Sequence, residues 1–340
     1  MTVRVLVVDD SALMRRIIVS ILEATDDLKV VGEAADPYEA RDLIKALSPD
    51  VLTLDVEMPR MDGLSFLGNL MRLRPMPVIM VSTLTERGAD VTLQAMALGA
   101  VDFITKPMSA SADWQQVGEE LCRKIRMAAG SIWHEPVRTT GQDHALSYTG
   151  HAANSIIALG ASTGGTEALS VVLQRFPPEA PAVVMAQHIP PVFSTSYAHR
   201  LDRTCKIQVH EAEDGMAILP GHAYLAPGDF HLQIVGKPGA WKAKVSQFDK
   251  VNRHRPSVDV LFASLVPYAS CCRAALLTGM GHDGAKGLLQ LREAGAHTVI
   301  QDEATSVVWG MPGAAAALGA AVKELPLSKI AQNLLVALGR

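Results

Sequence analysis

The stretch VRVLVVDD at residues 3–10 decides the fold of the first part of the chain. Its apolar run lacks polar alternation and stops at two aspartates, as expected for a parallel strand that is covered on both faces. Similar runs follow at 30–31, 51–54, 78–81 and 101–104, and amphipathic segments with helical spacing separate them. Five strand–helix units in this order predict a doubly wound α/β domain with a five-stranded parallel sheet.

The strand–helix rhythm breaks at about residue 126 and restarts at 155. The intervening chain is rich in Gly, Ser, Thr, Gln and His, which predicts a linker over 126–152 whose first turns can still be helical. Alternation and turn residues over 221–245 predict an inserted β-hairpin. Further strands are predicted at 155–159, 182–186, 274–277 and 298–300. We therefore expect domains at 1–125 and 153–340, the second with a Rossmann-like doubly wound parallel sheet and a hairpin.

The composition argues against several classes of protein. Of the 340 residues 49% are apolar, and the net charge of −4 leaves no surplus of positive charge for nucleic acid or an anionic membrane. The four cysteines show no metal-ligand spacing and fit a reducing compartment. No apolar segment approaches the ~20 residues that span a bilayer, and the N-terminal run is too short for a signal peptide. We expect a cytoplasmic protein with no membrane insertion and no nucleic-acid partner.

Polar side chains stand at the ends of four predicted strands in the first domain. Asp9 and Asp10 end the first strand, Asp55 the third and Ser82 the fourth, and Lys106 follows the fifth. The carboxyl ends of parallel strands lie along one edge of a sheet, so these side chains should converge. Three carboxylates repel one another unless a cation joins them, and hard oxygen ligands suit Mg²⁺.

This arrangement indicates a carboxylate that accepts a phosphoryl group. With Mg²⁺ at the site, one aspartate can attack phosphorus and form an acyl phosphate. Lys106 would bind the phosphoryl oxygens as a point charge. Taken singly, an Asp-Asp-Ser sequence after a strand is more often a helix N-cap, but the joint placement at four strand ends favours function.

Residues 1–125 resemble the receiver domain of response regulators, above all in DVEMPRMDG at residues 55–63 and in the Lys106-Pro107 pair. The resemblance implies a flavodoxin-like fold and a cis bond before Pro107. It also implies that Asp55 is the phosphorylated residue. The Mg²⁺ ligands that it implies are Asp9, Asp10, Asp55 and the main-chain oxygen of Glu57.

The same resemblance implies roles for three further residues. Ser82 and Lys106 correspond to the hydroxyl and the lysine of the receiver motif, and Phe103 corresponds to its aromatic switch residue. The phosphodonor of such a domain in chemotaxis is a histidine kinase, which is therefore an expected partner.

The second domain opens with the strand-to-helix turn GASTGG at residues 160–165. Gly160, Ser162 and Gly164 satisfy G-x-S-x-G, in which a sharp turn exposes a serine nucleophile above a sheet. The pattern is short, and a glycine-rich turn can also bind phosphate at a helix N-terminus or serve only as a tight turn. The serine therefore needs a base and an acid from other strand ends.

Two strand ends supply such partners. His188 follows the run that ends at 186, and Asp283 follows the run that ends at 277. A serine needs a base within hydrogen-bond reach, and the base needs a carboxylate that fixes its tautomer. His282 could replace His188, and Asp302, which also follows a strand, could replace Asp283. The residue pattern alone leaves both alternatives open.

The order Ser…His…Asp differs from that of α/β-hydrolases and resembles the chemotaxis methylesterases of the CheB family. The motifs that carry this resemblance are GASTGG, QHIP at 187–190 and TGMGHDG at 278–284. It implies that Ser162 is the nucleophile, His188 the base and Asp283 the orienting acid. The stretches HRPSVDVLF from residue 254 and QDE from residue 301 also look like family signatures, and we assign them no chemistry.

The family resemblance carries further implications for the site and the substrate. Thr163 would lie against the active-site histidine, and the main-chain amide of Met280 would bind the oxyanion. The substrates would be glutamate methyl esters and glutamines of methyl-accepting chemotaxis receptors, hydrolysed without a metal. We also expect the unphosphorylated receiver to cover the catalytic face and phosphorylation of Asp55 to free it.

Two other functions fit the sequence less well. A DNA-binding response regulator needs a basic recognition helix after the linker, and the second half offers no basic face. A nucleotide-binding domain built on the turn at 160–165 would need G-x-G-x-x-G and an acidic residue ~20 positions further on, where Val183 and its neighbours stand.

Overall fold

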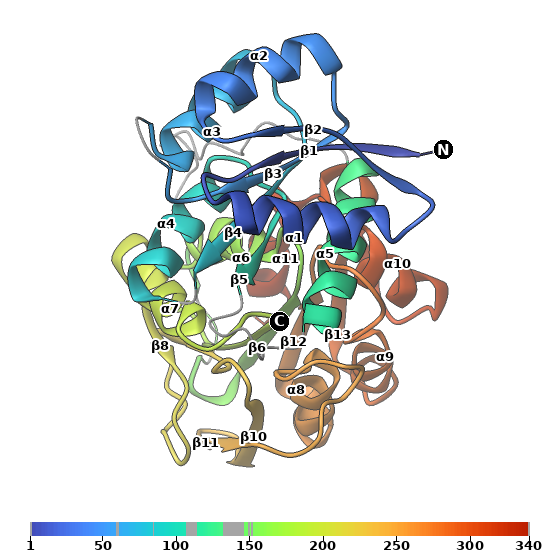
Figure 1. Cartoon of the computed structure of the whole chain (residues 1–340). Helices are drawn as coiled ribbons and strands as arrows, with labels where there is room; N and C mark the ends of the chain where they lie inside the picture. Colours follow the sequence, from blue (N-terminus) through green and yellow to red (C-terminus); the bar gives the residue numbers. More distant parts are fainter. Residues whose placement is uncertain are drawn as a thin grey trace. The chain divides into compact units, whose positions relative to one another are not determined.

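A computed structural model describes residues 2–58, 61–83, 85–106, 114–131, 146–148, 150 and 152–338 (Figure 1). The chain divides into two units, Met1–Pro136 and Val137–Arg340, which we describe separately. Pro107 and most of the predicted linker lie outside the described residues. The boundaries predicted at 125 and 153 stay a prediction. Among the helices that the structure describes, none has the length and apolar character needed to cross a membrane.

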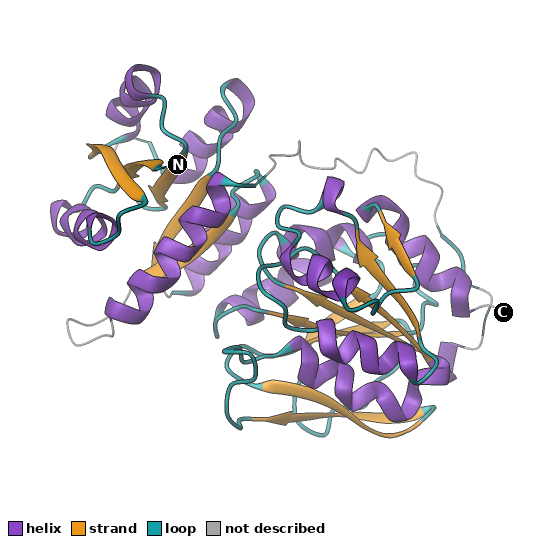
Figure 2. Cartoon of the chain, turned by 90° about the vertical axis from the view of Figure 1, so that its right-hand side faces the viewer, coloured by secondary structure: helices purple, strands orange, loops and turns teal. Residues whose placement is uncertain are grey.

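The first unit is built on a parallel sheet of five strands in the order β2-β1-β3-β4-β5. The strands are β1 (Val3–Val8), β2 (Leu28–Ala34), β3 (Val51–Asp55), β4 (Val78–Thr83) and β5 (Asp102–Lys106). The helices are α1 (Ala12–Glu23), α2 (Pro37–Leu47), α3 (Gly63–Leu73), α4 (Glu86–Ala97) and α5 (Trp114–Ala129). Helices cover both faces of the sheet (Figure 2), which confirms the predicted doubly wound fold.

Side-chain caps fix where the helices of this unit begin. Ser11, Asp36, Asp62 and Thr85 each accept a hydrogen bond from a main-chain amide in the first turn of α1, α2, α3 and α4. These caps satisfy amides that have no partner inside the helix. Helices α1, α2 and α4 begin within a few residues of the carboxyl ends of β1, β2 and β4. Polar side chains gather at this edge of the sheet.

The second unit has a parallel sheet of seven strands in the order β14-β13-β12-β6-β7-β9-β8. Its strands are β6 (Ile156–Ala161), β7 (Ala182–Gln187), β8 (Gln208–Glu211), β9 (His222–Leu225), β12 (Cys272–Leu276), β13 (His297–Gln301) and β14 (Lys323–Leu325). Its helices are η1 (Ala152–Asn154), α6 (Gly165–Leu173), α7 (Phe193–Thr204), α8 (Val258–Leu265), η2 (Val266–Cys271), α9 (Ala285–Glu293), η3 (Glu303–Thr305), α10 (Gly310–Ala317) and α11 (Leu327–Leu338). The predicted second parallel sheet is confirmed.

The inserted hairpin is smaller than the segment 221–245 indicated. It comprises β10 (His231–Lys237) and β11 (Ala240–Ser246), which pair antiparallel. The first part of the predicted segment instead forms β9, which joins the parallel sheet between β7 and β8. Helix α8 packs against the hairpin on one side and against β6 and β7 on the other (Figure 2). Its apolar residues Val258, Leu261, Phe262 and Leu265 are fully buried for this reason.

The order of the strands determines where a site can form in the second unit. Strand β6 lies between β12 and β7. From β6 the chain first forms β7 on one side, and it later returns to form β12 on the other side. A crevice forms at such a switch point outside the carboxyl ends of the strands. The loops after β6, β7 and β12 carry GASTGG, QHIP and TGMGHDG and therefore meet at this edge.

We predict that Gly63→Ala destabilises the first unit. A Cβ at Gly63 would fall on the main-chain oxygen of Asp55, whereas a Cβ at Gly68 in the same helix would meet only Leu98 Cδ1, at 3.8 Å. The clash should cost about 1–3 kcal/mol. Gly68→Ala should instead add about 0.5–1 kcal/mol of stability. Hydrogen exchange of the amides of β3 measures both effects within this unit. Equal exchange in the two variants would contradict the prediction.

Candidate active site and phosphoacceptor site

Ser162 lies in the sharp turn between β6 and α6, and its main chain is tied to both neighbouring strand ends. Its amide donates to the carbonyl of Thr278 at 3.0 Å. Its carbonyl accepts from the amide of Gly165 at 2.7 Å and from Gln187 Nε2 at 2.8 Å. Gly164 has φ +72°, a conformation that glycine adopts without strain. These constraints hold the half-buried hydroxyl at the carboxyl edge of the sheet.

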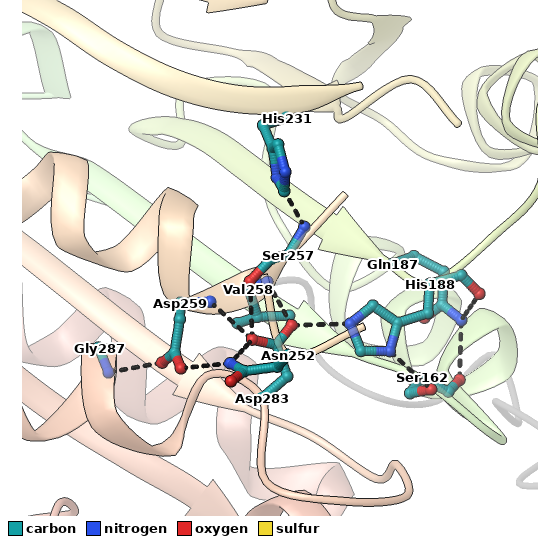
Figure 3. Close-up of polar contacts among 10 residues, drawn as sticks. All are labelled: Ser162, Gln187, His188, His231, Asn252, Ser257, Val258, Asp259, Asp283 and Gly287. Carbon is teal, nitrogen blue, oxygen red and sulfur yellow. Dashed lines mark hydrogen bonds and ion pairs between the residues drawn. The ribbon is translucent and has the colours of Figure 1, made fainter. Parts of the chain in front are cut away.

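His188 follows β7 and bridges the serine to a carboxylate (Figure 3). Its Nδ1 lies 3.1 Å from Ser162 Oγ, and its Nε2 lies 2.8 Å from Asp283 Oδ2. A carboxylate can only accept, so Nε2 carries the proton and Nδ1 is free to accept from the serine hydroxyl. The side chain of His188 is only 8% exposed, so most of the ring is shielded from solvent.

Asp283 is a buried carboxylate at the N-terminus of α8, with 1% of its surface exposed. Its donors besides His188 are Asn252 Nδ2, Ser257 Oγ and the amides of Val258 and Asp259, at 2.7, 2.7, 2.7 and 3.3 Å. Burial alone would raise the pKa of Asp283, but hydrogen bonds from His188, Asn252 and Ser257 hold this pKa well below its usual range. The positive end of the helix favours the same charge.

The two alternative residues lie elsewhere. His282 is exposed on the loop before Asp283. Asp302 caps η3, where its Oδ1 accepts from the amide of Thr305 at 3.0 Å and from the hydroxyl of Thr305 at 2.6 Å. The geometry therefore favours His188 and Asp283 over both alternatives.

The loop after β12 reaches the serine through Gly279. A Cβ at Gly279 would lie only 2.7 Å from Ser162 Cβ, so a larger residue would displace the serine. The amide of Gly279 donates to Val308 at 3.0 Å. Met280 comes next in the chain and is half-buried. The roles implied for the Met280 amide and for buried Thr163, whose carbonyl accepts from Thr278 Oγ1 at 3.0 Å, stay predictions.

Several residues of this site carry no role in the sequence-based prediction. Gln187 ties the serine turn to β7, and Gln301 Oε1 accepts from the amide of Thr278 at 2.9 Å, which supports the loop beside the serine. Asn252 and Ser257 bind Asp283, and the ring of His254 stacks on that of His188. The signatures QHIP, HRPSVDVLF and QDE pointed to this region without indicating its contacts.

The first unit gathers three carboxylates at the carboxyl edge of its sheet. Oxygens of Asp9, Asp10 and Asp55 lie within 4.8 Å of one another. Asp9 and Asp55 are buried and Asp10 is exposed, so the cluster opens to solvent on one side. Burial raises the pKa of Asp55 to about 6, although Lys106 opposes this shift. Clustered hard oxygens with open positions are the donor set that Mg²⁺ prefers, and these residues fit it.

Lys106 holds two of these carboxylates. Its Nζ lies 2.8 Å from Asp9 Oδ2 and 2.9 Å from Asp55 Oδ1. Burial acts to lower the pKa of Lys106, but the two ion pairs raise it overall. Ser82 is buried, and its hydroxyl donates within β4 and α4, to Thr83 and Gly88 carbonyls at 3.4 and 3.3 Å.

Two further receiver residues occupy defined positions. Phe103 is buried under Lys124, whose Nζ lies 5.3 Å from the ring centroid. Glu57 is exposed, and its amide hydrogen-bonds to Asp55. The proposed metal contact of its carbonyl and the switching role of Phe103 stay predictions.

Comparisons with known proteins match both units. The family model described as CheB methylesterase matches residues 157–334, and the model described as response regulator receiver domain matches residues 5–115. The chain is 53% identical over 345 residues to protein-glutamate methylesterase/protein-glutamine glutaminase 2 of Xanthomonas oryzae pv. oryzae (strain MAFF 311018), covering 98% of this chain and 96% of that protein. It is 50% identical over 341 residues to the protein-glutamate methylesterase/protein-glutamine glutaminase of Pectobacterium atrosepticum, covering 98% and 96%.

A solved structure matches the second unit. The crystal structure of the Thermotoga maritima CheB methylesterase catalytic domain is 38% identical, with a TM-score of 0.52. The match covers 54% of this chain and 98% of the Thermotoga maritima chain. The second unit, with its seven-stranded sheet and its hairpin, therefore shares the fold of that catalytic domain.

We predict that Asp283→Asn costs stability in a pH-dependent way. The pKa of Asp283 is depressed by folding, so its contribution is complete above the unfolded value of about 4 and is lost as pH falls below it. Replacing the carboxylate should cost roughly 3 kcal/mol at pH 7, because its donors lose a charged acceptor, and less at pH 3. Urea unfolding followed by circular dichroism measures this. Exposed Asp249→Asn is the control, and a cost for Asp283→Asn that does not change with pH would contradict the prediction.

Proposed function

Because this chain belongs to the CheB methylesterase family and carries a response-regulator receiver domain, we propose that it is a phosphorylation-regulated protein-glutamate methylesterase and protein-glutamine glutaminase of chemotaxis adaptation. The observation that carries this proposal is the hydrogen-bonded row Ser162–His188–Asp283. The substrates are γ-glutamyl methyl esters and glutamines on methyl-accepting chemotaxis receptors. The proposed place of action is the cytoplasm.

The reaction begins with attack of Ser162 Oγ on the ester carbonyl. His188 Nδ1 accepts the hydroxyl proton at a starting distance of 3.1 Å, as a general base. The ring then carries positive charge, which the buried carboxylate of Asp283 stabilises through the 2.8 Å bond to Nε2. Asp283 keeps its own charge because four further donors from this chain satisfy it.

The oxyanion forms next to the loop after β12. An added Cβ at Gly279 would lie 2.7 Å from Ser162 Cβ, and we assign the oxyanion to the amide of Met280, the next residue of this loop. One preorganised donor of this kind stabilises a transition state by about 3 kcal/mol. Thr163, the residue after the nucleophile, supports the turn through its bond from Thr278.

Collapse of the tetrahedral intermediate breaks the bond to the leaving group, which takes the proton from His188. The leaving group is methanol when the substrate is an ester and ammonia when it is a glutamine. Both reactions produce the same γ-glutamyl ester on Ser162. Water then attacks with His188 again as base, which releases glutamate and restores the serine. One site can therefore catalyse both hydrolyses.

The receiver supplies the regulation in this proposal. Asp55 attacks the phosphoryl group on the phosphohistidine of a histidine kinase, which breaks the P–N bond, releases the kinase histidine and leaves an acyl phosphate on Asp55. Asp9, Asp10 and Asp55, with the carbonyl of Glu57, would hold Mg²⁺, which when bound offsets the carboxylate charge and takes phosphoryl oxygens. Lys106 forms an ion pair with the phosphoryl group. Ser82 and Phe103 are the switch residues, whose conformations change when Asp55 is phosphorylated. The unphosphorylated receiver restrains the catalytic unit, and phosphorylation releases it.

We predict that Ser162→Ala abolishes hydrolysis without loss of stability. The nucleophile is gone while its main-chain bonds remain, so the rate should fall roughly 10³- to 10⁶-fold. Methanol release from methylated receptor membranes measures the rate. Ser196→Ala, on α7, is the matched control. Methanol release at the normal rate from Ser162→Ala would exclude the proposed mechanism.

We predict that Asp55→Asn removes stimulation by acetyl phosphate. The amide cannot form an acyl phosphate, so the ratio of methanol release with and without the phosphodonor should fall to about 1. Removal of Mg²⁺ by EDTA should do the same to the unmodified chain. Exposed Asp26→Asn is the control. Stimulation that persists in Asp55→Asn would refute the assignment of the phosphoacceptor.

A further inference from the structure

A tight turn at residues 251–254 lies against the candidate triad. Val251 and His254 exchange two main-chain hydrogen bonds, at 3.1 and 2.9 Å. The two central residues, Asn252 and Arg253, have φ of +51° and +69°, as in a type I′ turn. Asparagine tolerates this conformation better than most residues. The turn is therefore a defined structure that presents Asn252 and His254 at fixed positions.

Asn252 lies between the buried carboxylate of Asp283 and the half-buried carboxylate of Asp259 (Figure 3). Its Nδ2 lies 2.7 Å from Asp283 Oδ1 and 2.7 Å from Asp259 Oδ2. Burial, with a smaller contribution from the charge of Asp283, raises the pKa of Asp259. A primary amide nitrogen has two protons and no charge, so it can serve both acceptors at once. Asp259 is in turn anchored by the amide of Gly287 at 2.6 Å, which ties this pair to α9.

His254 covers one face of the His188 ring. The two ring centroids lie 3.6 Å apart, and the planes differ by only 6°. The edges of the His188 ring are already engaged by Ser162 and Asp283. A ring that is held at two edges and along one face cannot rotate or tilt without losing a contact.

We propose that the turn at 251–254 is a positioning element of the triad. Asn252 orients the carboxylate of Asp283, and the flat ring of His254 sets the plane of His188. Both are positioning residues, since each acts on the reaction through a triad member. This inference rests on the proposed function, because it assigns roles in the same hydrolysis. Proton transfer depends steeply on geometry, and a displacement near 1 Å can cost about 100-fold in rate.

The kinetic test compares three variants of the full chain with the unmodified protein. In His254→Ala, kcat for methanol release should fall about 10- to 100-fold with KM within about 2-fold, because the nucleophile and its base remain. His254→Phe keeps a flat ring and should restore kcat to within about 3-fold. Exposed His199→Ala is the matched control. A normal kcat in His254→Ala, or a Phe variant as slow as the Ala variant, would overturn the proposal.

A spectroscopic test follows the triad without relying on activity. The Nε2 proton of His188, bonded to Asp283, should give a downfield resonance in the full chain labelled with ¹⁵N-histidine. We expect this resonance to shift or broaden in His254→Ala and in Asn252→Ala, and to persist in His254→Phe. An unchanged resonance in both alanine variants would overturn the positioning role.

The two tests separate this inference from the proposed function. If Ser162→Ala still releases methanol, the proposed function fails, and the resonance alone decides whether the turn positions His188. If Ser162→Ala is inactive, the proposed function stands, and both kcat and the resonance must respond in His254→Ala.

Discussion

The catalytic unit depends on one buried carboxylate. Asp283 is shielded from water and yet fully satisfied, because donors from three other segments converge on its two oxygens (Figure 3). An ionised carboxylate in such surroundings is very costly without these partners. The loop after β12, the turn at 251–254, the N-terminus of α8 and the loop after β7 must therefore close together around it. This closure holds Nδ1 of His188 at 3.1 Å from Ser162 Oγ.

The two units use the same architecture for different chemistry. In both, polar residues at the carboxyl ends of parallel strands form the site, and helix caps or helix N-termini surround it. In the receiver, three carboxylates crowd together and Lys106 offsets part of their charge, an arrangement suited to a cation and a phosphoryl group. In the catalytic unit the charge of Asp283 is held by neutral donors. This favours an imidazole that changes its protonation during turnover.

Much of the fold follows from local patterns. Apolar runs such as those at 3–8 and 51–54 form central strands, because only such segments can be buried on both faces. The short edge strands β8 (QVHE) and β14 (KEL) escaped prediction since they carry little apolar character. The hairpin was placed too early, because β9 belongs to the same alternating segment but pairs with β7 and β8 instead.

The sequence by itself determined the fold class, the family resemblance and the residue types at the strand ends. The tertiary structure decided that Nδ1 of His188 faces Ser162, that Asp302 caps a helix instead of joining the row, and that Asn252 reaches Asp283 from 31 positions away. Periodicity and spacing report only neighbours along the chain. A hydrogen bond requires two atoms within about 3 Å, and for distant segments only the packing of helices on the sheet sets that distance.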